Sequence, residues 1–264
     1  MSNLIAVMGK YNLKQYDTVK EVKNMKIIAL DAGHGMNTAG KRCMKSIDPN
    51  ETREWYLNDR ISDRVEELLA DYDCKVVRVG DTTGKTDISL SQRVKTANNI
   101  NADIYISVHH NAGLNGHEGG GTIVYYCSNK AERKEQAQRL YDFVTDQTKL
   151  YGNRTSKVIK KNFYVIKNTK MPAFLIENGF MDSPTDVPII LSAEHAKKTA
   201  QGIWAFLVNE LSLIKKEDPN EPNTEPQDQE KKLYRVQVGA YSVKANAEAM
   251  MAKLKQAGFD GIIV

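Results

Sequence analysis

Between residues 25 and 214, short apolar runs alternate along the chain with segments of helical periodicity. Alternation of this kind is typical of an α/β fold, in which helices cover both faces of a mostly parallel sheet. We expect that architecture for residues 25–214. The predicted strands span residues 26–30, 75–79, 104–108, 122–127, 163–166 and 173–176, and the predicted helices lie within residues 48–68, 90–100, 131–150 and 193–211.

The start of the first helix is predicted from a capping pattern. Asp48 would be the N-cap, Pro49 would occupy the first helical position, and Glu51 follows three residues after the cap. In the last helix, apolar residues recur at positions 196, 200, 203 and 207 and define one buried face. His195 stands just outside that set, so we expect it on the surface.

The two ends of the chain have different patterns from the central region. Residues 1–24 form a polar N-terminal extension with weak periodicity, and residues 215–232 are acidic and proline-rich, as in a semi-extended linker. Residues 233–264 then show an alternating strand, an alanine-rich helix and a short apolar run. We therefore expect a catalytic domain at 25–214, a linker at 215–232 and a short C-terminal βαβ-like fragment at 233–264.

Composition excludes several classes of protein. The hydrophobic fraction is 41%, which is enough for a globular core, but no apolar run approaches the roughly 18 residues that a membrane span needs. The net charge of +4 is mild and no basic run predicts a nucleic-acid groove. The first residues make a poor secretory signal, so we expect synthesis in the cytoplasm without a signal peptide.

Chemically active side chains follow three of the predicted strands. His34, His109 and Glu177 each come at the end of an apolar run, and ligands bind beyond the carboxyl ends of strands in such sheets. Two histidines and a carboxylate are a common ligand set for catalytic zinc, and a further carboxylate can move the proton of the attacking water. The sequence offers His34, Glu54 and His109 as ligands of one zinc ion per chain, and Glu177 as the catalytic carboxylate.

Other polar residues leave alternatives open. Asp31 either accepts a hydrogen bond from a zinc-bound imidazole or caps the turn after its strand. Arg93 and Asn111 are candidates for contact with substrate. Glu51 lies one helical turn before Glu54 and competes with it as a ligand.

Four motifs in order resemble the zinc-dependent N-acetylmuramoyl-L-alanine amidases of the amidase_3 type. They are Asp-x-Gly-His-Gly at 31–35, Glu54-x-x-x-Asn58, Ser-x-His-x-Asn at 107–111 and Ile-Glu-Asn-Gly-Phe at 176–180. The resemblance covers residues 26–211. It implies that the three ligands and Glu177 act as assigned above, and that the substrate is the amide between N-acetylmuramic acid and L-alanine of peptidoglycan.

One position departs from the usual motif. His110 stands where these amidases commonly have alanine, and neighbouring side chains on a strand point in opposite directions. We therefore expect His109 to be the ligand and His110 to be a pocket wall or surface residue. His117 has no comparable context and is expected in a loop.

The tail, with the sequence Tyr-Arg-Val-Gln-Val-Gly-Ala-Tyr at 234–241, resembles the beginning of a SPOR repeat, a small peptidoglycan-binding domain. A full repeat is roughly twice as long, and a piece below about 40 residues usually needs extra support to fold. We therefore expect the tail to be loosely folded, to lean on the catalytic domain, or to pair with the tail of a second chain.

Three functions remain in competition. The leading hypothesis is a zinc amidase that lyses the cell wall after release by lysis or through a holin, either as a phage lysin or as a bacterial autolysin. A zinc peptidase or deacylase that acts on another wall amide is the alternative enzyme class. A wall-binding protein without turnover is the third, and the complete set of ligands disfavours it.

Overall fold

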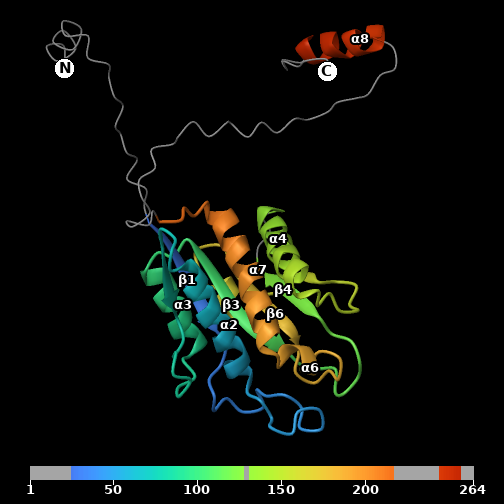
Figure 1. Cartoon of the computed structure of the whole chain (residues 1–264). Coiled ribbons are helices and arrows are strands. Elements are labelled where there is room, and N and C mark those ends of the chain that lie inside the picture. The colour runs from blue at the N-terminus through green and yellow to red at the C-terminus, as the bar shows by residue number, and fades with distance from the viewer. Residues whose placement is uncertain (1–24, 128–130, 217–243, 257–264) are drawn as a thin grey trace, which may run out of the picture. The chain divides into compact units, whose positions relative to one another are not determined.

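The computed structural model describes residues 25–127, 131–216 and 244–256 (Figure 1). The chain divides into two compact units, Met1–Lys216 and Glu217–Val264.

A six-stranded sheet forms the centre of the first unit. Its strand order is β2 (Cys74–Arg78), β1 (Lys26–Ala32), β3 (Ile104–Asn111), β6 (Ala173–Phe180), β4 (Thr122–Tyr126) and β5 (Val158–Lys160). The pairs β2–β1, β1–β3, β3–β6 and β4–β5 are parallel, whereas β4 and β6 are antiparallel. The predicted mostly parallel sheet is therefore confirmed.

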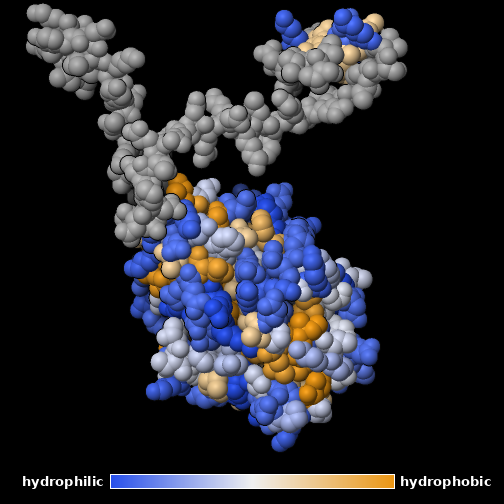
Figure 2. All heavy atoms as spheres, viewed as in Figure 1, coloured by the Kyte–Doolittle hydropathy of each residue, from blue (hydrophilic) through white to orange (hydrophobic). Residues whose placement is uncertain are grey.

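Helices cover both faces of this sheet, as the sequence predicts. The helices α2 (Glu54–Leu69), α4 (Ala131–Thr148) and α7 (Ala193–Leu211) pack on one face and enclose a core that includes Ile106, Ile176 and Phe206. The outer surface of this helical layer is mostly hydrophilic in Figure 2, with scattered apolar patches.

The opposite face is covered by two shorter helices. They are α3 (Leu90–Asn99) and the single turn α5 (Tyr164–Lys167), which contribute Val94 and Val165 to a second core with Tyr105 and Leu175. A further turn, α6 (Val187–Ile190), follows β6. Because side chains alternate along a strand, residues 105, 107 and 109 of β3 all lie on this second face.

The predicted helix start at Asp48 is wrong. Helix α2 begins at Glu54, and the Asp48 carboxylate instead accepts hydrogen bonds from the backbone N–H groups of Asn50 and Thr52, at 3.1 and 2.7 Å. Aspartate makes local contacts of this kind in turns as readily as at helix N-termini. Glu51 has a positive φ of 48°, which is incompatible with a continuing helix.

Two further expectations are corrected. The predicted strand at 163–166 is instead the helical turn α5, and the strand β5 lies just before it. The turn lets the neighbouring residues Val165 and Ile166 both enter the second core, whereas a strand would direct them to opposite faces. His195 is only 4% exposed, because the first turn of α7 packs over the end of β6.

In the second unit, the structure describes helix α8 (Lys244–Gln256), in agreement with the predicted alanine-rich helix. Its partly covered side chains include Ala247, Met250, Met251 and Leu254, which lie on one face, and none of its described side chains is buried. The predicted strands at 233–241 and 261–264 fall outside the described residues, as does the extension at 1–24. Within the described ranges, no helix combines the length and the apolar character that a membrane crossing requires.

Candidate metal centre

Three neighbouring strands deliver the candidate residues to one edge of the sheet. His34 lies just after β1, whereas His109 and Glu177 lie near the ends of β3 and β6. These strands are adjacent and parallel, so their carboxyl ends meet. In the register of β3 and β6, His109 is paired directly with Glu177.

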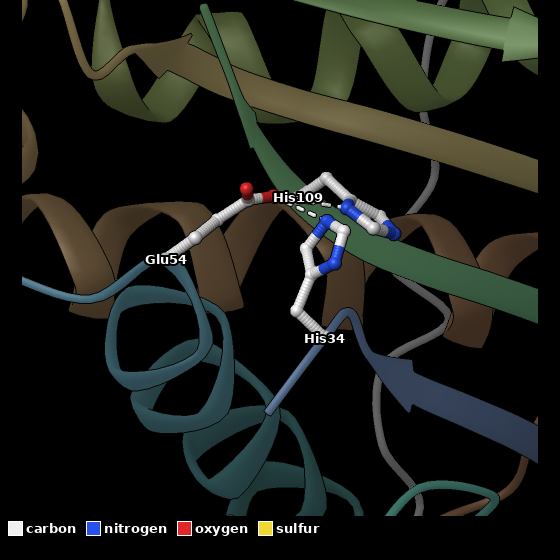
Figure 3. Close-up of side chains that lie close together, drawn as sticks. All are labelled: His34, Glu54 and His109. Carbon is white, nitrogen blue, oxygen red and sulfur yellow. Dashed lines mark hydrogen bonds and ion pairs between the residues drawn. The ribbon is translucent and has the colours of Figure 1, made fainter. Parts of the chain in front are cut away.

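Glu54 reaches the same point from the first residue of α2. Its Oε1 lies 3.0 Å from His109 Nδ1 and 3.4 Å from His34 Nε2, and one ligand atom from each of the three residues falls within 4.8 Å of the others. Figure 3 shows the two imidazole rings and the carboxylate converging from β3, the loop after β1 and α2. The sequence-predicted ligand set is therefore one cluster in space.

Electrostatics in the cluster favours a cation. Burial raises the pKa of the Glu54 carboxyl, but hydrogen bonds and charge from His109 and His34 outweigh burial and hold this pKa below its usual value. Burial lowers the pKa of His109, but its contacts with Glu54 outweigh burial and the pKa is raised. The Oε2 atom of Glu54 is buried without a hydrogen-bond partner, and Lys41 Nζ lies 3.7 Å from it.

Glu177 has a different environment. Burial raises its pKa to about 7, against the opposing charge of His109. Lys41 and Lys161 lower the same pKa, so two cations act on this carboxylate, and its Oε2 is buried without a hydrogen-bond partner. A carboxyl group that titrates near neutrality suits proton transfer.

The peptide around His34 is held in an uncommon conformation. His34 has φ 68°, in the left-handed region that non-glycine residues adopt at a cost of order 1–3 kcal/mol. Two buried side chains fix it: Asn58 Nδ2 donates to the carbonyl of Gly33 at 3.1 Å, and Arg93 donates to the carbonyl of His34 at 2.9 Å. The loop therefore presents the His34 ring in a fixed position.

Arg93, predicted as a candidate for substrate contact, is 1% exposed. Its guanidinium also bonds Asp31, Asp87 and the carbonyls of Ala32 and Ile88, so every N–H direction has a protein partner. In this structure Arg93 holds the loop that carries His34. Asn111 lies at the end of β3, and its Oδ1 accepts from the backbone N–H of Ala112.

Asp31 is connected to His109 through Ser107. The Asp31 carboxylate accepts hydrogen bonds from the hydroxyls of Tyr105 and Ser107, at 2.7 and 2.8 Å. Ser107 Oγ then lies 3.1 Å from His109 Nε2. Because the Ser107 proton points to Asp31, Oγ accepts from Nε2–H, and the Nδ1 lone pair of His109 is left for a metal.

Sequence reasoning missed Gly33 and Ser107 as individual residues. A Cβ on Gly33 would overlap the imidazole of His109, so glycine is needed for the ring to lie against the backbone. Ser107 belongs to the Ser-x-His motif, and its spacing of two before His109 on one strand places both side chains on the same face. That spacing is the signal by which the contact was predictable.

A cleft of about 300 Å³ opens beside His34 and His109. Its lining comes from the loop after β1, the start of α3, His109 of β3 and Val165 of α5. Apolar side chains from Ile88, Leu90 and Val165 form much of its wall. The lining residues are Asp31, Gly33, His34, Asp87, Ile88, Ser89, Leu90, Arg93, His109 and Val165.

The remaining candidates lie away from the cluster or behind it. Glu51 pairs with Arg42 and Lys45, at 3.2 and 3.7 Å, and is not part of the ligand cluster. His117 lies in a loop, as expected. His110 is buried on the α2–α7 face, and burial lowers its pKa well below the usual value.

Comparison with protein families and known structures agrees with this geometry. Residues 28–209 match a family model described as N-acetylmuramoyl-L-alanine amidase, and residues 216–264 match the SPOR domain. The N-acetylmuramoyl-L-alanine amidase CwlM of Bacillus licheniformis is 29% identical over 243 residues, which cover 90% of this chain and 84% of that protein. The endolysin of Bacillus phage SPP1 is 28% identical over 203 residues, which cover 76% of this chain and 71% of the endolysin.

Solved structures give the same result for the fold. An N-acetylmuramoyl-L-alanine amidase from Clostridium difficile 630 superimposes with a TM-score of 0.63 at 29% identity, covering 72% of this chain and 98% of that one. The catalytic domain of CwlV from Bacillus (Paenibacillus) polymyxa superimposes with a TM-score of 0.63 at 26% identity, covering 71% and 99%.

Proposed function

Because the chain belongs to the N-acetylmuramoyl-L-alanine amidase family, we propose that it is a zinc-dependent enzyme that hydrolyses the amide between N-acetylmuramic acid and L-alanine in peptidoglycan. The observation that carries this proposal is the cluster of His34, Glu54 and His109, whose possible ligand atoms lie within 4.8 Å of one another. Glu177 lies next to this cluster, because it is the backbone partner of His109 in the register of β3 and β6. The proposed site of action is the cell wall.

The donor set fits zinc. Two imidazole nitrogens and one carboxylate are a common set for catalytic zinc, with a position left open for water or substrate. The side chains of His34 and His109 are 20% and 14% exposed, whereas Glu54 is covered, so the cluster is reached from the histidine side. When bound, zinc lowers the pKa of water toward about 7 and polarises a carbonyl oxygen.

Glu177 is proposed as the proton carrier. In its ionised form it accepts the proton of the attacking water, and in its protonated form it gives that proton to the departing amino group of L-alanine. With its pKa raised to about 7, both forms are accessible near neutral pH. Asp31 and Ser107 orient the ring of His109, and Arg93 and Asn58 hold the loop of His34.

Substrate contact is assigned to the cleft beside the histidines. Its apolar wall at Ile88, Leu90 and Val165 suits the methyl-bearing groups next to the scissile amide. Asn111 lies at the end of β3 near Glu177 and remains the candidate for a polar contact with the substrate. The SPOR match at 216–264 supports a second contact with peptidoglycan through the tail.

Two biological settings fit the proposed activity, that of a bacterial autolysin and that of a phage lysin. The relatives include a sporulation-specific N-acetylmuramoyl-L-alanine amidase of Bacillus subtilis and the endolysin of Bacillus phage SPP1. We infer that this protein acts on the wall either as a bacterial autolysin or as a phage lysin, after release by lysis or a holin. Pairing of two tails remains one of the alternatives that the sequence leaves open for the C-terminal segment.

The deciding experiment is digestion of purified muropeptides followed by mass spectrometry. An amidase releases stem peptides with a free L-alanine amino group and leaves the glycan intact. Cleavage inside the stem peptide would instead identify a peptidase, and no product from zinc-loaded protein would identify a binding protein.

Metal analysis of the same protein tests the ligands. We expect one zinc per chain for the wild type and for Glu51→Gln, and substoichiometric zinc for His34→Ala, His109→Ala and Glu54→Gln. Full zinc content in Glu54→Gln together with loss in Glu51→Gln would reverse the assignment of the carboxylate ligand.

A further inference from the structure

His110 is bonded to the loop that carries the candidate ligand His34. The His110 ring lies on the opposite face of β3 from His109, and its Nδ1 is 2.8 Å from Asn58 Oδ1. The other end of the same amide, Asn58 Nδ2, donates to the carbonyl of Gly33 at 3.1 Å. Gly33 directly precedes His34, so a chain of two hydrogen bonds leads from His110 to the peptide of the ligand.

The direction of these bonds is fixed by the atoms involved. Because Gly33 offers a carbonyl acceptor, the amide of Asn58 must present its NH₂ group there and its oxygen to His110. That oxygen needs a donor, which the Nδ1–H tautomer of a neutral His110 supplies. Loss of the His110 ring would therefore remove the hydrogen bond that Asn58 Oδ1 accepts and leave the amide held by its Nδ2 bond to Gly33.

His110 also touches the carboxylate ligand through its backbone. Its N–H lies 3.3 Å from Glu54 Oε1, and Asn58 stands one turn after Glu54 on α2. All of these groups are buried: His110 is 2% exposed, Asn58 is fully covered, and Glu54 is 1% exposed. In such surroundings a lost partner leaves a buried polar atom unsatisfied, which costs about 1–3 kcal/mol.

We propose that His110 is a positioning residue of the metal site, which acts through Asn58 to hold the Gly33–His34 peptide in place and so raises the affinity for zinc. The proposal rests on the proposed zinc site. Groups that orient metal ligands typically change metal affinity about 10–100-fold when removed.

Two substitutions of similar volume separate hydrogen bonding from packing. His110→Leu fills the site without a donor, whereas His110→Gln keeps an amide N–H that can donate to Asn58. Zinc affinity is measured on the full-length chain by competition with a chromogenic chelator, and folding is checked by circular dichroism. We expect a loss of at least tenfold for His110→Leu and less than threefold for His110→Gln.

His195 provides the matched control. It is equally buried and its ring packs edge-to-face on that of His110, with centroids 6.5 Å apart. Its ring bonds go to the carbonyl of Asn178 and to Thr199, and not to the loop of His34. We expect His195→Leu to bind zinc within threefold of the wild type. An equal loss in this control would show that zinc affinity only follows core stability, which overturns the proposal.

A double-mutant cycle tests the route through Asn58. If His110 acts through that amide, then His110→Leu should cause no further loss of zinc affinity in an Asn58→Ala background. Additive losses, or wild-type affinity in His110→Leu, would overturn the proposal while leaving the zinc site standing. A wild-type protein that binds no zinc would overturn the zinc site itself. If His110→Leu does not fold, His110→Ala replaces it in the same cycle.

Discussion

Glu177 lies directly beside His109 in the parallel register of β3 and β6. One backbone pairing therefore fixes the spacing between a proposed metal ligand and the proposed proton carrier. Both residues belong to adjacent strands in the middle of the sheet, where the backbone is held on both sides. We therefore expect the two side chains to have different roles, with His109 binding the metal and Glu177 transferring protons.

Replacement of Glu177 by glutamine tests that division. The amide has nearly the same shape but cannot accept a proton, so zinc content and folding should stay unchanged while turnover falls about 10²–10⁴-fold. Zinc is quantified per chain and turnover is followed on soluble muropeptides. A loss below tenfold with zinc still bound would show that another group carries the proton.

The pH dependence of wild-type activity also tests the role of Glu177. Glu177 must be ionised to accept a proton, and burial raises its pKa to about 7. The rate should therefore rise with pH across an acid limb between 4.5 and about 7, and the positive charge of zinc moves that limb toward the lower end. A profile of kcat/KM at constant ionic strength gives its position. A flat profile from pH 4 to 7 would contradict the role of Glu177.

Gly33→Ala should damage the metal site without changing any ligand. The added Cβ would overlap the ring of His109, so the imidazole must move and zinc affinity should fall at least tenfold. Gly40→Ala is the control, because a Cβ there meets nothing within 4 Å, although its φ of +72° makes alanine mildly strained. Chelator competition compares the two variants. Equal zinc affinities would show that the ring of His109 has more freedom than the structure indicates.

His195 makes a testable contribution to the pH dependence of stability. Burial lowers its pKa to about 4, against an ordinary value of 6.5 in the unfolded chain. As pH falls, the unfolded chain therefore takes up the proton at a higher pH than the folded chain. The free energy of unfolding keeps its full value above pH 6.5 and decreases as pH falls toward 4. At pH 5 the loss amounts to about 2 kcal/mol.

The variant His195→Gln removes this titration. Its free energy of unfolding in urea should fall less between pH 8 and pH 5 than that of the wild type, by about 2 kcal/mol. The neighbouring His110 also stays neutral by burial, so some pH dependence will remain in the variant. Identical slopes in the two proteins would show that His195 is already charged at pH 5.

The sequence predicted where the site lies better than it predicted the residues that hold the site in place. His34, His109 and Glu177 follow apolar runs, and the rule that strand ends meet in a parallel sheet was sufficient to bring them together. The role of Arg93 depended on tertiary packing, since no periodicity tells whether an arginine on a helix reaches inward to the loop of His34. Its five bonds to that region became visible only in the structure.

Two errors have a common physical cause. His195 was expected on the surface because the apolar spacing of α7 passes through Ala196, but the helix packs against α2, α4 and the end of β6 and buries a wider stripe. The Asp48 pattern fits a helix start as well as a turn, and only the contacts with Thr52 decide between them. Local propensity gives way to tertiary packing in both cases.

Removal of residues 217–264 tests the division between catalysis and wall binding. Every proposed catalytic and metal-binding residue lies before Ala193, and the first compact unit ends at Lys216. The shortened protein should therefore retain zinc and cleave soluble muropeptides within twofold of the full chain. Activity on intact walls should fall more, because residues 216–264 match a SPOR domain and a second contact raises the effective concentration at an insoluble substrate.

The same pair of proteins reports on pairing of the tails. The partly covered residues of α8 include Ala247, Met250, Met251 and Leu254, which form a single apolar stripe too small to offset the ordering of its segment alone. If the tails associate, light scattering should give the full chain a molar mass that exceeds that of the shortened chain by more than the mass of the removed residues. Equal activity losses on soluble and insoluble substrates would show instead that the tail supports the catalytic fold, and that the boundary at residue 216 is misplaced.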